Sequence, residues 1–184
     1  MTESSAAIDA EIAGLSRRPK DVEIPPVLSV VAVQTLTEVE SYATRVREVL
    51  VAGFEICKIA DFGSETLPVD GLPGWFSDQE PTIPADVASG RNGFISQRAA
   101  DPLDIQEWLE MLDPESRQWR WWDITVGGPR LALIWVDAFG EVVFNCEELY
   151  WLLYSCGARA VVGPLLLPSI VWKGQESIGL HDRR

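Results

Sequence analysis

This chain of 184 residues has almost no histidine, and that absence restricts the chemistry it can perform. The single histidine, His181, is the fourth residue from the C-terminus, in a tail that is expected to fray. A Ser-His-Asp or Cys-His centre needs an imidazole beside its nucleophile, and a zinc site with these ligands needs a spacing that the chain lacks. The sequence therefore predicts no catalytic histidine or cysteine, no metal and no cofactor. It favours a protein that is not an enzyme, and carboxylate chemistry is the one enzymatic route left.

Other familiar signals are missing as well. Neither G-x-G-x-x-G nor G-x-x-x-x-G-K-[ST] occurs, so both common nucleotide-binding loops are absent. No apolar run approaches the roughly 20 residues that span a bilayer, and the acidic start differs from a signal peptide. Cys57, Cys146 and Cys156 form no C-x-x-C pair and have apolar neighbours, which is typical of buried, reduced thiols. We expect a cytoplasmic protein, and the excess of arginine over lysine with few asparagines is typical of a bacterial source.

Basic residues are also scarce. The net charge is −13 and the isoelectric point is near 4.4. A nucleic acid or an anionic membrane needs a basic surface, so neither is an expected partner. Two interpretations of the charge stay open: it keeps the domain soluble, or an acidic face steers a protein partner that has a basic surface.

The segment from residue 61 to residue 93 favours the second interpretation. It is rich in acids, proline and glycine, and Arg91 is its only base. Frequent proline and glycine interrupt helices and strands, so this composition predicts a long irregular loop. Trp75 and Phe76 stand on a turn within it, where they either pin the loop to the core or anchor an interface. The candidate partner-binding residues of this loop are Asp70, Trp75, Phe76, Asp78 and Glu80.

Hydrophobic periodicity and turn residues predict an α+β fold. An N-terminal arm and linker over 1–26 precede a single domain over 27–184, in which capping boxes at Thr37/Glu40 and Asn145/Glu148 begin two helices. The expected architecture is a mostly antiparallel sheet of about five to seven strands with two or three helices packed on it and a long irregular acidic loop. The predicted helices are 5–15, 37–53, 101–113 and 145–157, and the predicted strands are 27–33, 54–60, 118–126, 131–136, 141–144, 158–162 and 170–172.

Two aromatic clusters complete the list of candidates. The helix over 145–157 is apolar nearly all round, so it must bury a second face; Tyr150, Trp151 and Tyr154 on its flank face either a second layer of the domain or a partner. In the strand that follows residue 117, alternation puts Trp119 and Trp121 on the same face as Asp123. Together with Trp135 these three residues form a candidate ligand pocket, although core filling is the other interpretation.

The function that these patterns favour is a non-catalytic protein-binding module, such as an acidic inhibitor or immunity-type protein that blocks a basic partner. One alternative is a small-molecule or sugar-binding protein, or a carboxylate-using enzyme, with a tryptophan-lined pocket. The other alternative is a structural subunit of a homo-oligomer or a larger assembly, held by the flank of the helix over 145–157.

Overall fold

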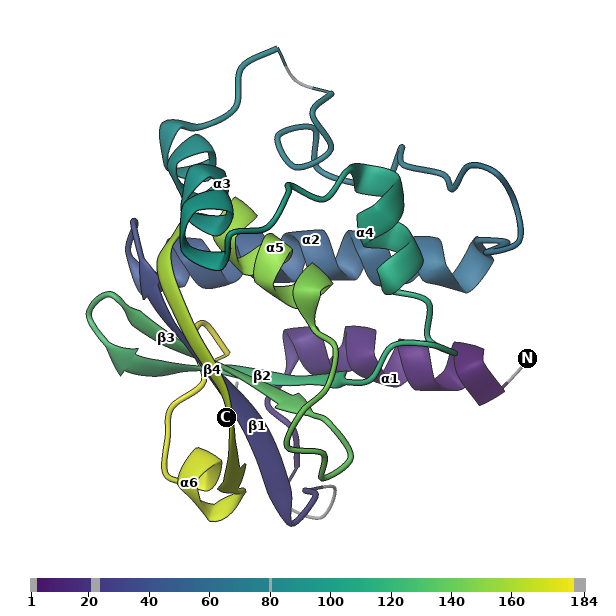
Figure 1. Cartoon of the computed structure of the whole chain (residues 1–184). Helices are drawn as coiled ribbons and strands as arrows, with labels where there is room; N and C mark the ends of the chain where they lie inside the picture. The colour runs from purple at the N-terminus through teal and green to yellow at the C-terminus, as the bar shows by residue number, and fades with distance from the viewer. Residues whose placement is uncertain (1–2, 21–23, 80, 181–184) are drawn as a thin grey trace.

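The structure is a computed structural model of the whole chain, and it describes residues 3–20, 24–79 and 81–180. These residues form six helices and one four-stranded antiparallel sheet (Figure 1). The predicted α+β class is confirmed, whereas the prediction of five to seven strands is wrong for the described residues. The helices are α1 (Glu3–Ser16), α2 (Val39–Ile59), α3 (Ala85–Arg98), α4 (Ile105–Met111), α5 (Glu147–Ser155) and α6 (Ile170–Lys173), and the strands are β1 (Val27–Thr35), β2 (Arg120–Gly128), β3 (Leu131–Asp137) and β4 (Ala158–Pro168).

The sheet has the strand order β2-β3-β1-β4, and every neighbouring pair is antiparallel. The chain passes from β1 through α2 to β2, and β3 then returns to lie between these two strands. After β3, α5 leads to β4, which lies beside β1 at the other edge of the sheet. This is a split βαβ connectivity, with α3 and α4 inserted between α2 and β2. Helices α2, α3, α4 and α5 lie on one side of the sheet, and α6 lies on the other (Figure 1).

Apolar side chains cover both faces of the sheet. Alternate residues of β1 point to opposite sides, so Val31 and Val33 join the large core under the helices, whereas Leu28 and Val30 join a small core on the far side. Trp172 of α6 completes the small core. The predicted strand over 170–172 is therefore wrong, because these residues form a short helix that places its tryptophan on the sheet.

Two glycines in helices explain two further errors. Gly53 was expected to end a helix, but α2 continues to Ile59 and removes the predicted strand over 54–60. A Cβ atom on Gly53 would lie 2.9 Å from the ring of Trp108, so glycine at this position allows Trp108 to pack closely against α2. Gly90 lies in α3, which occupies the second part of the predicted loop. A Cβ atom there would lie 1.9 Å from the backbone oxygen of Tyr154 in α5.

The chain between Ile59 and Ala85 has neither helix nor strand in its described residues. The predicted strand over 141–144 is also irregular, and β4 runs through Pro164 to Pro168, which an edge strand tolerates. The helix expected from Asp101 begins only at Ile105, because Asp104 caps it and forms a capping box with Glu107.

Both terminal segments pack onto the domain. Ile8 and Leu15 of α1 are buried in the large core, beside α2 and β2. Past α6 the chain pairs with the free edge of β2. The amide of Val126 donates to the carbonyl of Glu176 at 3.0 Å, and the amide of Ile178 donates to the carbonyl of Ile124 at 2.9 Å. This edge of the sheet is therefore covered by the C-terminal segment.

Candidate functional site

The residues predicted to bind a partner from the long loop are only partly accessible. The expectation that Phe76 is an exposed anchor is wrong: it is buried and packs edge-on against Trp108 with ring centroids 4.7 Å apart. Trp75 is half-buried, and Asp78 is exposed but paired with Arg91 at 2.5 Å. Asp70 is exposed to solvent, whereas Glu80 and His181 lie outside the described residues.

The aromatic flank of α5 is buried. Tyr150, Trp151 and Tyr154 are at most 5% exposed, so a partner cannot reach them and the expected contact surface is wrong. Helix α3 supplies the second layer, with Phe94 edge-on to Trp151 at 5.1 Å and to Tyr154 at 5.8 Å between ring centroids. The prediction that this helix buries more than one face is confirmed, and α3 covers it.

The predicted tryptophan pocket is not formed, because a β-bulge reverses the alternation in β2. Trp121 pairs with Val136 and Asp123 pairs with Trp135, so Trp122 is an extra residue between them. Trp119 and Trp121 therefore lie in the core under the helices, whereas Asp123 and Trp135 lie on the far side of the sheet. The expectation that Trp119, Trp121 and Asp123 share a face is wrong for Asp123.

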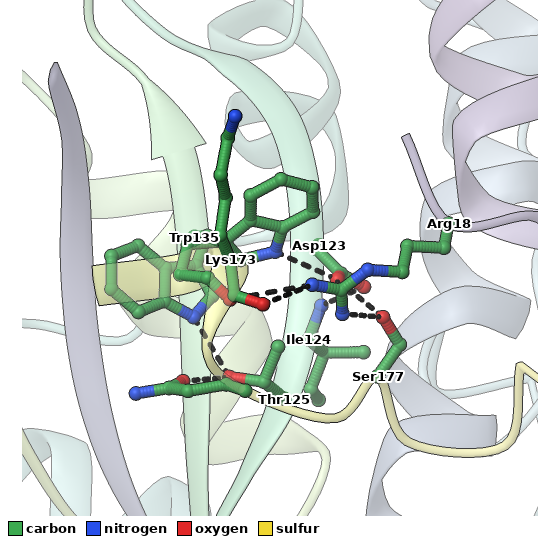
Figure 2. Close-up of polar contacts among 9 residues, drawn as sticks. Arg18, Asp123, Ile124, Thr125, Trp135, Lys173 and Ser177 are labelled. Atoms are coloured by element: carbon green, nitrogen blue, oxygen red, sulfur yellow. Dashed lines mark hydrogen bonds and ion pairs between the residues drawn. The ribbon is translucent and has the colours of Figure 1, made fainter. Parts of the chain in front are cut away.

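Asp123 is buried and fully engaged (Figure 2). One carboxylate oxygen accepts from the amide of Ile124 at 2.8 Å, and the other accepts from the indole of Trp172 at 2.9 Å and the hydroxyl of Ser177 at 2.6 Å. Arg18 lies 3.6 Å from the same oxygen and donates to Ser177 at 2.8 Å. Burial raises the pKa of Asp123, and its hydrogen bonds oppose that rise. Asp123 therefore joins the segments at both ends of the chain to β2, which is a structural role.

Glu148 on α5 is a second buried carboxylate, and only one of its two oxygens accepts a hydrogen bond. The side chain is 2% exposed, and one oxygen accepts from the indole of Trp119 at 2.6 Å. The other oxygen, Oε2, has no hydrogen-bond partner among the described residues. Burial raises the pKa of Glu148 to about 7, although the Trp119 hydrogen bond and the charge of Arg117 act in the opposite direction.

Arg117 lies beside this carboxylate and is also buried, with its side chain 3% exposed. It forms an ion pair with Glu11 of α1, and its guanidinium lies 4.7 Å from the ring centroid of Phe54 and 4.8 Å from that of Trp119. The other oxygen of Glu11 accepts from the amide of Trp121 at 2.8 Å, so both oxygens of Glu11 are used. The charge of Arg117 is therefore balanced by Glu11.

A pocket of about 250 Å³ opens next to Glu148. Its walls come from α4, from the segment before β2 and from the start of α5, and they are formed by Glu110, Met111, Ser116, Arg117, Gln118, Asn145 and Glu148. A second pocket, of about 210 Å³, borders Arg117 together with Glu11, Trp119 and Phe139.

Sequence reasoning missed Glu148 because it assigned this residue to a capping box with Asn145. The N-cap of α5 is Cys146, one residue later, and Glu148 points into the protein toward Trp119. The signal in the sequence was a second acid in the first turn of a helix that is apolar nearly all round. Glu147 occupies the partly exposed position beside Arg98, and Glu148 is buried.

The loop between β3 and α5 borders these pockets and carries exposed apolar side chains. Phe139, Val142 and Val143 are 54%, 66% and 87% exposed. The loop is attached at both ends: the amide of Phe139 donates to Asp137 at 2.9 Å, and the amide of Asn145 donates to the side chain of Gln118 at 2.9 Å. We call residues 139–143 the apolar loop.

A second group of exposed apolar residues lies on β4 and α6. Val162, Leu165 and Ile170 are 65%, 59% and 69% exposed. The homo-oligomer predicted from the sequence stays a prediction; β4 is an edge strand of the sheet, and Val162 and Leu165 on it are exposed.

Within the described part of the chain, no helix is both long and apolar enough to cross a membrane. No group of three or more histidine, cysteine, aspartate or glutamate side chains among residues 3–20, 24–79 and 81–180 is arranged to hold a metal ion. The chain matches no family model, no curated protein and no solved structure.

Proposed function

We propose that this chain is a protein-binding module for a partner with a basic surface, of the inhibitor or immunity-protein type. The observation that carries the proposal is the apolar loop. Three large apolar side chains within five residues, Phe139, Val142 and Val143, are each more than half exposed on a loop that is anchored at both ends. Grouped exposure of this kind is uncommon on soluble proteins outside binding sites.

The charge around the loop indicates the kind of partner. Glu141 belongs to the loop, Glu115 borders the same pocket as Phe139, and Glu110 borders the same pocket as Asn145; all three are exposed. Three arginines line the pockets that border the loop: Arg98 is paired with Glu147, Arg117 is paired with Glu11, and the guanidinium of Arg120 lies 5.0 Å from the ring centroid of Phe139. The three exposed acids therefore outnumber Arg120, so a partner with an apolar centre and a basic rim fits this end of the molecule.

A larger acidic surface adjoins this end. Residues 59–90 and 99–116 contain no lysine or arginine, and the second stretch has Asp101, Asp104, Glu107, Glu110, Asp113 and Glu115. The two stretches touch where Leu67 and the side chain of Gln106 exchange hydrogen bonds of 2.7 and 3.2 Å. An acidic field of this extent accelerates encounter with a basic protein, and salt weakens that effect.

The test uses a photo-crosslinking residue, p-benzoylphenylalanine, in place of Val143. Ile59, which is 79% exposed at the end of α2, is the matched control position. The captured protein is identified, purified and titrated against the wild-type chain. We expect one basic protein to crosslink at residue 143 and not at residue 59, with an association rate that falls as salt rises.

The variant Val142→Ser/Val143→Ser should then weaken binding by roughly tenfold or more, because it removes the apolar contact at the centre of the interface. Ile59→Ser, which removes an equally exposed apolar side chain elsewhere, should leave the affinity unchanged. Equal crosslinking at the two positions, or equal affinities for the two variants, would overturn the proposal.

A second candidate function is acid–base catalysis at Glu148. The observation that favours it is the burial of Glu148 beside a pocket, which raises the pKa of the carboxyl to about 7; a general acid or base works best when its pKa is close to the working pH. A turnover rate that titrates near neutral pH and disappears in Glu148→Gln would support this candidate. A substrate that is converted equally by that variant would remove it.

A further inference from the structure

The pocket beside Glu148 differs from the surroundings of the other buried acids described above. Glu11 uses both of its oxygens, on Arg117 and on the amide of Trp121, and Asp123 uses both of its own. Glu148 uses one oxygen on Trp119 and has no partner for Oε2, although it is 2% exposed. An unpaired oxygen on a buried carboxylate is costly, so a group that binds it gains more than it would at the surface.

We propose that this pocket receives the side chain of an arginine or lysine from the partner, whose cationic group binds the carboxylate of Glu148 at the pocket wall. The proposal rests on the protein-binding function, and it names the chemical group that the pocket selects. A volume of about 250 Å³ suits one long side chain rather than a larger molecule. Asn145 lines this pocket and also lines a neighbouring pocket together with Val142 and Val143 of the apolar loop, so one partner surface can reach both.

The charges around the pocket favour a cation over an anion. The charge of Arg117 is offset by its ion pair with Glu11 through one nitrogen, although its Nε and Nη1 have no hydrogen-bond partner among the described residues. Glu110, at the exposed rim, adds a second carboxylate to that of Glu148. The ionised pocket therefore has an excess of negative charge that a guanidinium or an ammonium neutralises.

Hydrogen-bond acceptors line the same wall. The side-chain carbonyl of Gln118 accepts from the amide of Asn145 at 2.9 Å, and that of Asn145 accepts from the amide of Glu147 at 3.4 Å. Each carbonyl oxygen has a second lone pair that a further donor can use. A guanidinium, with five N–H donors, is suited to such a set of acceptors.

Binding should depend on pH because only the ionised carboxylate attracts a cation strongly. The charged or titratable groups that face Glu148 are Arg117, Glu110 on α4, and Cys146 and Glu147 on α5. Burial raises the pKa of Glu148 to about 7, so the affinity for a cation should rise as the pH passes through neutrality. By linkage, the bound cation should lower that pKa.

The experiment titrates the full chain with N-acetyl-arginine amide and follows the backbone amides by NMR. N-acetyl-citrulline amide has nearly the same shape without the charge, and acetate is an anionic probe. We expect the arginine probe to shift the amides of Gln118, Asn145 and Glu148 with a dissociation constant on the order of 10 mM. Citrulline should bind roughly tenfold more weakly, and acetate should leave these amides unchanged.

Glu148→Gln keeps the acceptor for Trp119 and removes the charge, so it should weaken arginine binding by roughly tenfold. Glu65→Gln, at an exposed position of the long loop, is the matched control and should have no effect. The carboxyl carbon of Glu148 in the wild-type chain gives an independent readout, since saturation with the arginine probe should lower its pKa by about one unit. This titration does not depend on whether the variant folds.

Equal binding of citrulline, binding of acetate, or a pKa of Glu148 that the arginine probe does not move would each overturn the pocket proposal. Failure here is distinct from failure of the protein-binding function. If the Val142→Ser/Val143→Ser variant loses the partner but the pocket does not bind arginine, only the pocket proposal is wrong. If the pocket binds arginine but the partner binds equally well to the variant of the apolar loop, the proposed role of the loop is wrong.

Discussion

The indole N–H of Trp119 donates to Oε1 of Glu148 at 2.6 Å and orients this carboxylate within the core. Trp119 is fully buried on the segment that leads into β2, and Glu148 is in the first turn of α5. The contact therefore joins two of the three elements that enclose the pocket. It leaves Oε2 without a partner among the described residues, in a side chain that lines the pocket together with Arg117.

The first prediction concerns stability against pH. Burial raises the pKa of Glu148 from an ordinary value of 4.5 to about 7, so the folded state binds a proton that the unfolded state has already released. The stabilisation is complete below about pH 4.5 and is lost as the pH rises through 7. A shift of this size corresponds to about 3 kcal/mol. Glu148→Gln should therefore unfold at a urea concentration that changes less between about pH 5 and pH 8.5 than in the wild type.

Glu65→Gln is the control for this prediction because Glu65 is exposed. Its unfolding should follow the wild-type dependence on pH. A Glu148→Gln variant whose stability falls with pH as steeply as that of the wild type would show that another group is responsible.

The second prediction concerns the contact between the terminal segments and β2. Asp123→Ala removes the acceptor for Trp172, Ser177 and the amide of Ile124, and it leaves Arg18 without its ion pair. Buried donors without an acceptor are costly, so the free energy of unfolding should fall by about 3 kcal/mol.

Hydrogen exchange locates this effect. The amide of Ile178 donates to Ile124 and should exchange much faster in Asp123→Ala, because the C-terminal segment separates from β2. Asp70→Ala, at an exposed position, should change neither quantity. Unchanged protection of Ile178 in Asp123→Ala would contradict the proposed role of Asp123.

The third prediction concerns the packing of α3 on α5. Gly90→Ala would bring a Cβ atom to 1.9 Å from the backbone oxygen of Tyr154, which cannot move without displacing α5. We expect a loss of about 3 kcal/mol in the free energy of unfolding, measured by chemical denaturation. Ser89→Ala is the control: Ser89 is exposed on the same helix, and alanine there should be neutral or slightly stabilising. Equal effects of the two substitutions would mean that the close contact is absent.

The fourth prediction concerns the three thiols. Cys57, Cys146 and Cys156 are all buried. Burial raises the pKa of Cys57 to about 12 and that of Cys146 to about 12, and it also raises the pKa of Cys156. Because the thiolate is the reactive form, a disulfide reagent at about pH 8 should modify the native protein at least about a hundredfold more slowly than the denatured one. Rapid modification of one thiol in the native state would identify an opening that the structure does not contain.

Local patterns predicted the parts of the fold that depend on local chemistry. The predicted strands over 27–33, 118–126 and 131–136 correspond to β1, β2 and β3. The apolar surface of α5 correctly predicted a second covering layer. These features follow from periodicity and turn residues within one segment.

The errors arose where a residue's role depends on a distant contact. Gly53 and Gly90 have the local signature of helix breakers, yet each provides room for a side chain or backbone from another helix. The bulge at Trp122 depends on pairing with β3, so it could not be seen in the tryptophan run itself. Glu148 has the spacing of a capping residue, and only its contact with Trp119 reveals that it points inward.

The affinity of the purified partner, measured by calorimetry against four variants, is the most direct test of this account. Val142→Ser/Val143→Ser and Glu148→Gln should each weaken binding by roughly tenfold or more, whereas Ile59→Ser and Glu65→Gln should bind as the wild type does. If the variants of the apolar loop and of Glu148 bind as tightly as the two controls, the binding surface lies elsewhere and the account is wrong.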